Sequence, residues 1–535
     1  MAKKKGKKAT KPSTEFKLTY ATMYNPPELL HQKYERALKK VMDNLGQDHP
    51  MLINGKDVRS RDKFEDRSPI NQDWLLGTFQ KGSPSHAQQA LSAARKAFPD
   101  WSRRSWKSRL QLLRKAAKQI DKRVYEIAAV ISIEVGKNRM EALGDIAEAA
   151  DLIRYACDQM EANEGFKVKM GTDPLKGFKP SNTSLLRPYG VWVVISPFNF
   201  PAALTGGPVG AALVAGNTVV MKPATDTPWT VRLLAECFRD AGLPDGVLNF
   251  VTGPGSTLGQ ALIDSPVVDG ITFTGSFDIG MKIFRLFANG QYPRPTILEM
   301  GGKNPSIVSK NADIERAAAG IVRSSFGLQG QKCSANSRVY VERPVYKQLV
   351  ERVAEITRKI AVGDPTDRTV FLGPVINKGV YNDFKKFTKE LSKAGTFITG
   401  GKVITEGAFA KGFFCEPTIV TGVPHSHRLW KHEMFLPITM MHPVSNLTQA
   451  MKLANDSQYG LTAGFYGSDE EAAWFFENIE AGVTYANRPQ GSTTGAWPGF
   501  QPFGGWKGSG SSGKNAGGHY YLQLYMHEQI HTIIR

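Results

Sequence analysis

Short apolar runs alternate with helix-spaced apolar positions through the middle of the chain. The pattern predicts strands at 191–195, 218–221, 248–251 and 270–274, separated by helices at 202–215, 227–241 and 256–264. A strand that is apolar throughout is buried on both faces, and a helix after each strand supplies the crossover that parallel strands need. The series therefore predicts a parallel sheet with helices on both of its faces.

A second series of the same kind begins after Glu299. It has strands at 305–308 and 338–342, helices at 314–326 and 346–361, and continues to a strand at 483–487. Single cores rarely grow beyond about 250–300 residues, so a chain of 535 residues should form two α/β domains, with a boundary at 295–299. Ahead of both series, the pattern predicts helices at 27–46, 85–98, 107–134 and 138–163 and strands at 51–58 and 74–79.

Two further strand-like segments, 183–187 and 520–534, have no neighbour in either series. We expect them to pair with each other or with another subunit. The glycine-rich segment 491–518 also contains Trp497, Phe500, Phe503 and Trp506. Scattered aromatic residues are unusual in a flexible linker, so this segment is expected to be a long functional loop.

The formal net charge of +19 is concentrated in part at the N-terminus. Residues 1–11 contain six lysines and no acidic residue, so residues 1–13 are expected to be a disordered basic tail. Such a tail either keeps the protein in solution or binds nucleic acid or an anionic membrane. It lacks the apolar stretch of a secretory signal.

Two features indicate a soluble protein of a reducing compartment, which we take to be the cytoplasm. The four cysteines (Cys157, Cys237, Cys333 and Cys415) lie far apart and form no C-x-x-C pair, which argues against disulfides and zinc. Residues 190–221 carry no charge and are long enough to span a membrane, but prolines and glycines interrupt them. No membrane span is therefore expected.

Three local motifs are, when taken alone, weak evidence for a nucleotide-binding or metal-binding site. The glycines of 253–259 follow a strand and open a helix, but the last comes one residue late for a dinucleotide loop, so an ordinary turn is the alternative. Residues 508–515 approach a P-loop but have Asn515 where Ser or Thr should bind Mg²⁺. His425, His427 and His432 fit no standard ligand spacing, so no metal site is expected.

Cys333 and Glu299 are the candidates for covalent chemistry. Cys333 lies among small and polar residues, where Lys332 and a helix N-terminus would lower the thiol pKa and favour the nucleophilic thiolate. Glu299 ends a predicted strand just before two glycines. Local spacing cannot join residues this far apart in the sequence.

Several segments together resemble the aldehyde dehydrogenase superfamily. Residues 298–304 (LEMGGKN) and 330–333 (GQKC) look like its paired active-site signature. Further resemblances, in family order over roughly 50–535, are 195–201 (ISPFNFP), 221–224 (MKPA), 273–276 (FTGS), 433–435 (EMF) and 502–505 (PFGG). The resemblance implies a Rossmann-type NAD(P)-binding domain (14–167 and 188–298), a catalytic domain (299–488) and a small β element for oligomerisation (168–187 and 518–535).

The same resemblance implies a role for each site residue. Cys333 would attack the aldehyde, Asn199 and the Cys333 backbone N–H would hold the oxyanion, and Glu299 would activate the water that hydrolyses the thioester. The implied cofactor positions are Ser196, Pro197, Phe198, Lys222, Ala224, Gly255, Gly259, Thr274, Gly275, Ser276, Met300, Gly301, Glu433 and Phe435. Thr225 stands where many NAD-selective relatives carry Glu, so NAD is expected and NADP stays open.

The C-terminal loop resembles the 1-pyrroline-5-carboxylate dehydrogenase branch, whose substrate is L-glutamate γ-semialdehyde. In residues 489–517, the amides of Gly495 and Ala496, together with Ser334, would then anchor the amino-acid end, and Phe200 and Phe503 would enclose the aliphatic chain. The alternatives are a relative acting on succinate semialdehyde or an aromatic aldehyde, and a non-catalytic binding protein with a nucleic-acid-binding tail. A homo-oligomer is implied.

Overall fold

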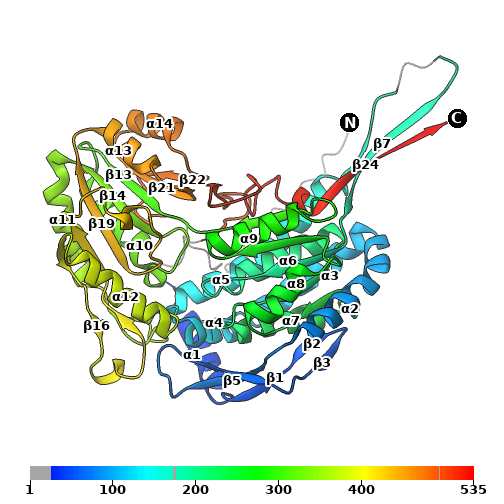
Figure 1. Cartoon of the computed structure of the whole chain (residues 1–535), viewed down its shortest axis with the longest axis horizontal. Helices are drawn as coiled ribbons and strands as arrows, with labels where there is room; N and C mark the ends of the chain where they lie inside the picture. The colour runs from blue at the N-terminus through cyan, green and yellow to red at the C-terminus, as the bar shows by residue number, and fades with distance from the viewer. Residues whose placement is uncertain (1–25, 173–175, 493–494) are drawn as a thin grey trace, which may run out of the picture.

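The computed structural model describes residues 26–172, 176–492 and 495–535, and the basic tail lies outside these ranges. Two lobes lie side by side, and a long β arm extends from one of them (Figure 1). Each lobe is built on a seven-stranded sheet. In the described residues, no helix is both long and apolar enough to cross a membrane.

The first sheet has the order β12-β11-β8-β9-β10-β2-β3. Its parallel strands are β8 (Val191–Ile195), β9 (Thr218–Lys222), β10 (Leu248–Phe250), β11 (Gly270–Thr274) and β12 (Thr296–Glu299). The hairpin of β2 (Met51–Ile53) and β3 (Lys56–Val58) adds antiparallel strands at one edge. The core strands are buried on both faces, which is why their sequences are apolar throughout.

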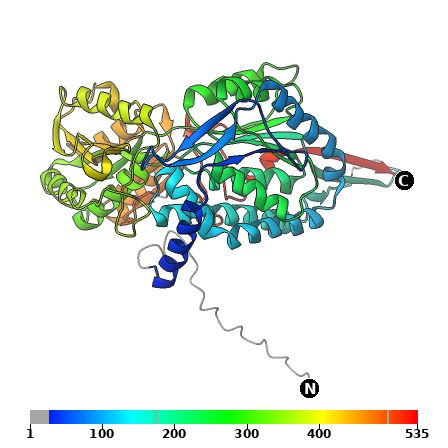
Figure 2. The same cartoon turned by 90° about the horizontal axis from the view of Figure 1, so that it is seen from below.

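Helices cover both faces of this sheet. One face packs against α2 (Pro84–Arg103), α8 (Gln260–Asp264) and α9 (Phe277–Ala288). The other packs against α6 (Ala203–Ala215) and α7 (Pro228–Asp240), behind which lie α3 (Trp106–Lys122), α4 (Val124–Val135) and α5 (Arg139–Ala162). The helix α1 (Glu28–Met42) packs on α4 and projects from the body in the view from below (Figure 2).

The uncharged segment 190–221 forms β8, α6 and β9, and its glycines bring α6 close to α5. A Cβ added at Gly206, Gly207 or Gly210 would lie 2.6–3.0 Å from the side chains of Ala149, Leu152 or Ile153. Side chains at these positions would therefore push the two helices apart. The composition that resembles a membrane span reflects tight helix packing inside the lobe.

The second sheet has the order β15-β18-β19-β14-β13-β21-β22 and is parallel except for β15. Its strands are β13 (Asn304–Val308), β14 (Asn336–Glu342), β15 (Thr396–Thr399), β18 (Thr418–Thr421), β19 (Ile438–Val444), β21 (Thr462–Tyr466) and β22 (Val483–Ala486). One face packs on α10 (Ile314–Phe326) and α11 (Arg343–Arg358), the other on α12 (Lys378–Leu391), α13 (Leu447–Asn455) and α14 (Asp469–Asn478).

The two strands without neighbours in the sequence pattern pair with each other. β7 (Pro180–Pro188) runs antiparallel to β24 (Met526–Ile534), and β6 (Lys167–Lys169) pairs with the other edge of β7. These strands form the arm in Figure 1. The expectation of one strand over 520–534 was wrong at its start, because Leu522–Tyr525 form a 3₁₀ turn that is buried against the first lobe.

Shorter elements complete the fold. β1 (Gln47–His49), β5 (Leu75–Gln80) and β4 (Lys63–Arg67) form a three-stranded sheet, and two strand pairs are β16 (Val403–Ile404) with β17 (Phe414–Cys415) and β20 (Tyr459–Gly460) with β23 (Trp506–Lys507). The short helices are η1 (Gly255–Gly259), η2 (Gly327–Gly330), η3 (Gly407–Phe409) and η4 (Arg428–Trp430), with η5 (Leu522–Tyr525) leading into the arm.

Candidate active site

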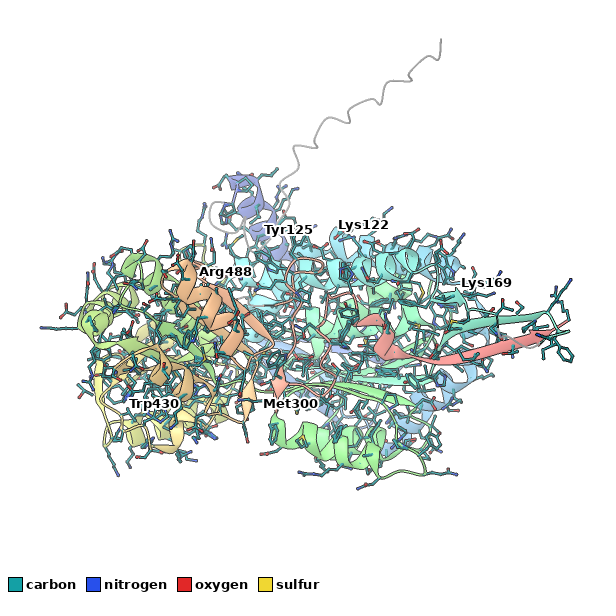
Figure 3. All side chains as sticks on the ribbon, turned by 90° about the horizontal axis from the view of Figure 1, so that it is seen from above. Lys122, Tyr125, Lys169, Met300, Trp430 and Arg488 are labelled. Carbon is teal, nitrogen blue, oxygen red and sulfur yellow. The ribbon has the colours of Figure 1, made fainter. Side chains whose placement is uncertain are left out.

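Cys333 and Glu299 come from different lobes and line one cavity. Glu299 is the last residue of β12 in the first sheet, and Cys333 follows η2 and precedes β14 in the second. The cavity encloses about 920 Å³ when its open mouth is included, and most of its wall is apolar. Met300, the neighbour of Glu299, lies where the two lobes meet (Figure 3). The structure thus joins two residues that sequence spacing could not.

The backbone leading to Cys333 is held in an uncommon conformation. Leu328, Gln329 and Gly330 have φ values of +46°, +55° and +68°, in the left-handed region that costs non-glycine residues about 1 kcal/mol each or more. The Gln329 side chain donates to the Gly136 carbonyl at 2.7 Å, and the Leu328 N–H donates to the Glu141 carboxylate at 3.1 Å. Contacts from outside the loop therefore fix its shape.

Asn304 fixes the other side of the same turn. Its side-chain N–H groups donate to the carbonyl oxygens of Cys333 at 2.6 Å and of Ala335 at 2.9 Å, and its Oδ1 accepts from the Thr462 N–H at 2.9 Å. A Cβ at Gly302 would lie 2.3 Å from the Cys333 carbonyl oxygen, so the second glycine of the pair allows this close approach. Asn304 was part of the recognised motif, but sequence reasoning gave it no role.

Asn199 is buried next to the Cys333 loop. Its side-chain N–H donates to the Gln331 carbonyl at 2.9 Å, and Asn199 itself is not part of the cavity wall. The following residue, Phe200, does line the cavity, and the Lys137 ammonium lies 3.7 Å from the centre of its ring. Lys137 forms a fully buried ion pair with Asp145 at 2.9 Å, and Asp145 accepts from the Ala203 N–H at the start of α6. This pair supports the segment that carries Asn199 and Phe200.

Burial dominates the electrostatics of Cys333 and Glu299. It raises the pKa of the Cys333 thiol to about 12, and the nearby Glu433 and Glu299 carboxylates add to the rise. The expectation of a lowered thiol pKa was wrong. Cys333 follows a 3₁₀ turn and does not begin a helix, while the buried Lys332 lies close to Gly327 and Glu141. Burial also raises the pKa of Glu299 to about 8, and its Oε2 has no hydrogen-bond partner.

The same cavity is lined by the predicted substrate residues Gly495, Ala496, Phe200 and Phe503. Ser334 is buried, its hydroxyl has no hydrogen-bond partner, and it does not line the cavity. Glu148 of α5, which sequence reasoning missed, also lines it. Its Oε1 accepts from the Ala496 N–H at 2.6 Å, and a Cβ at Gly495 would lie 2.0 Å from its Oε2. Within α5, nothing but tertiary contact distinguishes this acid from the others.

Several residues predicted to hold a cofactor gather beside the carboxyl ends of the first sheet. The Lys222 ammonium is buried and donates to the Pro223 carbonyl at 2.9 Å, and burial lowers its pKa to about 8. A Cβ at Gly259 would lie 3.5 Å from the Lys222 Cε, so the glycine turn and the lysine are neighbours. The Ser196 hydroxyl is buried without a hydrogen-bond partner. Gly255 opens η1 with free space around it.

A second group of these residues lies nearer Cys333. The Gly275 N–H donates to the Glu299 carbonyl at 3.1 Å, and Ser276 precedes α9. Glu433 accepts from the Gly302 N–H at 2.8 Å and leaves no room for a Cβ at Gly301. Phe435 meets Phe198 edge to face at 5.9 Å. Thr274 and Met300 line the cavity itself, while Pro197 and Ala224 lie beside Ser196 and Lys222 in the sequence.

The histidine-rich segment has a packing role. His425 stacks on Trp430 at 5.3 Å, His427 accepts from the Leu429 N–H, and His432 packs on Phe387. Across residues 26–172, 176–492 and 495–535, no group of three or more histidine, cysteine, aspartate or glutamate side chains could hold a metal ion.

Fold and site together define a class. The chain matches the model described as "Aldehyde dehydrogenase family" over residues 57–530, and it therefore belongs to the aldehyde dehydrogenase family. A relative from Geobacillus sp. (strain WCH70), named 1-pyrroline-5-carboxylate dehydrogenase, is 39% identical over 507 residues, 93% of this chain and 95% of the relative. One from Bacillus subtilis (strain 168), named 1-pyrroline-5-carboxylate dehydrogenase 2, is 38% identical over 504 residues, 92% of this chain and 95% of the relative.

Solved structures agree with these sequence relatives. One described as 1-pyrroline-5-carboxylate dehydrogenase from Thermus with bound NAD has a TM-score of 0.90 at 33% identity, and covers 98% of this chain and 99% of its own. Another, named 1-pyrroline-5-carboxylate dehydrogenase, has a TM-score of 0.90 at 34% identity and covers 98% of this chain and 100% of its own. The predicted α/β architecture and family are thereby confirmed.

Proposed function

We propose that this protein oxidises L-glutamate γ-semialdehyde, the open form of 1-pyrroline-5-carboxylate, to L-glutamate with NAD(P), as a step of proline breakdown. The observation that carries the proposal is one cavity that is lined by Cys333 and Glu299 and also by Gly495, Ala496 and Glu148. The names of the relatives from Geobacillus and Bacillus support the same substrate.

The part of the cavity wall formed by Gly495, Ala496 and Glu148 suits a zwitterion. The amides of Gly495 and Ala496 are in place for a carboxylate, because small residues let an anion approach the backbone. Glu148 now accepts from one of these amides at 2.6 Å. A bound substrate carboxylate would take that amide, and the substrate ammonium would lie next to the Glu148 carboxylate. Succinate semialdehyde has no ammonium, so it would place two carboxylates against each other there.

Phe200 and Phe503 form apolar parts of the cavity wall. Both rings line the cavity and are nearly buried, at 5% and 9% exposure. The aliphatic chain of the substrate would lie between them and be removed from water. The Lys137–Asp145 pair behind Phe200 would keep that ring in place.

The chemistry begins at the Cys333 sulfur. The thiolate would add to the aldehyde carbon, and the carbonyl oxygen would take the negative charge of a thiohemiacetal. The Cys333 backbone N–H and the Asn199 amide would stabilise that charge, each such donor being worth about 3 kcal/mol. A bound NAD(P) supplies the hydride acceptor that turns this adduct into a thioester. The high pKa of the thiol in the buried site means that its proton must leave before attack.

Glu299 would then activate the hydrolytic water. A carboxylate with a pKa of about 8 is a stronger base than an exposed one, and its Oε2 is free to accept from water. Water attacks the thioester carbon while Glu299 takes the water proton. The C–S bond then breaks, the carboxylic acid leaves, and the Cys333 thiol is restored. Over the whole cycle, aldehyde, water and NAD(P)⁺ give acid, NAD(P)H and a proton.

The residues beside the first sheet fit a dinucleotide. Lys222 and the Ser196 hydroxyl are buried polar groups with few protein partners, so ribose hydroxyls would satisfy them. The free N-terminal face of η1 at Gly255 and the helix start after Ser276 suit the pyrophosphate. Glu433 would accept from the nicotinamide-side ribose. At Thr225 the side chain is exposed and uncharged, so we expect NAD to be used and NADP to be tolerated.

We further propose that the protein works as a homo-oligomer in the cytoplasm. The arm exposes Ile530, Ile533 and Ile534 at 52–54%, and apolar side chains on a sheet edge favour pairing with another chain. All four cysteines are free, as expected in a reducing compartment.

The test is an initial-rate panel of glutamate semialdehyde, succinate semialdehyde and benzaldehyde, each with NAD and NADP. Wild type should show the highest kcat/KM on glutamate semialdehyde. Glu148→Gln should raise the KM for that substrate about tenfold and leave benzaldehyde within twofold, because only the zwitterion meets the Glu148 charge. A wild-type preference for succinate semialdehyde or benzaldehyde would contradict the proposed substrate.

A further inference from the structure

Asn304, the first residue of β13, directs its whole side-chain amide at the turn that carries Cys333. It is buried at 2% exposure and does not line the cavity. Its two amide hydrogens go to the carbonyl oxygens of Cys333 at 2.6 Å and of Ala335 at 2.9 Å, while its Oδ1 accepts from the Thr462 N–H at 2.9 Å. A primary amide has two hydrogens to donate, so this turn takes both of them.

The Cys333 carbonyl oxygen lies in a narrow slot between Asn304 and Gly302. A Cβ at Gly302 would be 2.3 Å from this oxygen, so the glycine leaves the space that the oxygen occupies. The short bond from Asn304 holds the oxygen there. The peptide group between Cys333 and Ser334 is trans, so its N–H points away from its C=O. Fixing the Cys333 carbonyl therefore also fixes the direction of the Ser334 N–H.

The Ser334 N–H faces the Cys333 sulfur. Burial raises the pKa of the Cys333 thiol, whereas the backbone N–H groups of Ser334 and of Cys333 itself lower it, because a donor beside the sulfur stabilises the thiolate. The charged groups that face the thiol are Glu433 and Glu299, which raise its pKa, and Lys332 of its own turn. The two backbone donors thus favour the thiolate in a site where burial and both carboxylates oppose it.

Asn249 of β10 makes the same set of bonds without a nucleophile beside it. It is buried, donates to the carbonyl oxygens of Gly246 at 2.8 Å and Val219 at 3.4 Å, and accepts from the Asn54 N–H at 2.9 Å. It does not line the cavity. The two asparagines therefore contribute to the fold in similar ways and differ in the peptide group that each one orients.

From these contacts we propose that Asn304 is a positioning residue for the nucleophile: it holds the Cys333 carbonyl so that the Ser334 N–H donates to the sulfur. This role rests on the proposed function only in taking Cys333 as the nucleophile. The Ser334 N–H acts on the thiolate before it adds to the aldehyde, whereas Asn199 would act on the substrate oxygen afterwards.

The test is alkylation of the full chain by iodoacetamide, without aldehyde or cofactor, with labelling at Cys333 followed by mass spectrometry. Asn304→Ala should move the pH profile of the rate upward by about one unit, so that alkylation between about pH 7 and 10 is about tenfold slower. Asn304→Ser keeps one hydroxyl donor and should be about threefold slower. The buried free thiols of Cys157 and Cys237 serve as internal references.

Two variants separate this role from general loosening. Asn249→Ala removes the matching bonds in the other lobe, so it should lower the melting temperature by a similar amount and leave alkylation within about twofold of wild type. Thr462→Val removes a hydroxyl bond of 3.3 Å to the Ser334 carbonyl. That carbonyl belongs to the next peptide group along the chain, so this variant should also stay within about twofold.

An unchanged pH profile in Asn304→Ala would overturn the proposal, and so would an equal shift in Asn249→Ala or Thr462→Val. If circular dichroism shows that Asn304→Ala does not fold, Asn304→Ser decides, and a wild-type profile in that variant overturns the proposal. Alkylation needs no aldehyde, so a wrong substrate assignment would appear in the initial-rate panel and leave this result unaffected.

Discussion

The active-site cavity and the surface cleft beside α1 are built in opposite ways. The cavity brings Glu148, Glu299 and Cys333 together from distant segments, with both carboxylates buried and the thiol partly buried, so that the pKa values of Glu299 and Cys333 depend on the whole fold. One exposed helix, α1, supplies three of the cations that line the cleft, at spacings visible in the sequence: Lys33, Arg36 and Lys40. Covalent chemistry needs groups removed from water, whereas the charges of a surface helix stay exposed and hydrated.

This difference has a practical consequence. A substitution in the cavity should change kcat or KM by tens of times to about ten thousand times, because no neighbouring residue can replace the lost group. Changes at the cleft should leave the reaction untouched. The predictions below test that separation, starting with the largest effect.

Cys333→Ala should reduce NAD(P)H formation by about 10⁴-fold or more, because it removes the thiol that lines the cavity. NAD binding, followed by quenching of intrinsic fluorescence, should be retained. Full turnover in this variant would contradict the covalent mechanism.

Glu299→Gln should release a burst of NAD(P)H equal to the enzyme concentration, followed by turnover about 10²–10³-fold slower, because the thioester forms but lacks its base. Stopped-flow absorbance at the reduced-cofactor band measures both phases. Steady turnover at the wild-type rate, without a burst, would remove Glu299 from this role.

Gly495→Ala should raise the KM for glutamate semialdehyde by about 30-fold, because the new Cβ would lie 2.0 Å from Glu148 Oε2 and displace the anchor. Benzaldehyde, which does not use the anchor, serves as the internal control and should change by less than threefold. An equal loss on both substrates would indicate general damage to the cavity.

The pH profile should report Glu299. With a pKa of about 8, its basic fraction rises from about a tenth at pH 7 to about nine tenths at pH 9, so kcat should rise about ninefold where hydrolysis limits the rate. Activity therefore rises as the pH increases through the pKa of Glu299 and falls as the pH drops below that pKa. In Glu299→Gln this step should flatten, and a step that persists unchanged must come from another group.

K33E/R36E/K40E should change kcat and KM for aldehyde oxidation by less than twofold, the smallest effect of the series. None of these side chains lines the cavity. A loss comparable to that of Gly495→Ala, in a protein with the wild-type melting temperature, would show that cavity and cleft are coupled.

The sequence by itself determined the two α/β series and the family. Apolar strands such as 191–195 are buried on both faces, and α10 occupies the predicted 314–326, because these elements follow from local periodicity. The charge pattern of α1 is equally local. The motif around Cys333 predicted a candidate nucleophile for the same reason, since the motif lies within one short segment.

Only the tertiary structure decided the rest. The pairing of β7 with β24 and the approach of Glu148 to Ala496 join segments hundreds of residues apart, and the 3₁₀ turn at Leu522–Tyr525 is buried against the first lobe. The thiol pKa was misjudged because burial, which no neighbouring residue reveals, outweighs the charge of Lys332. Desolvation and long-range contact are properties of the folded chain, so local sequence patterns cannot contain them.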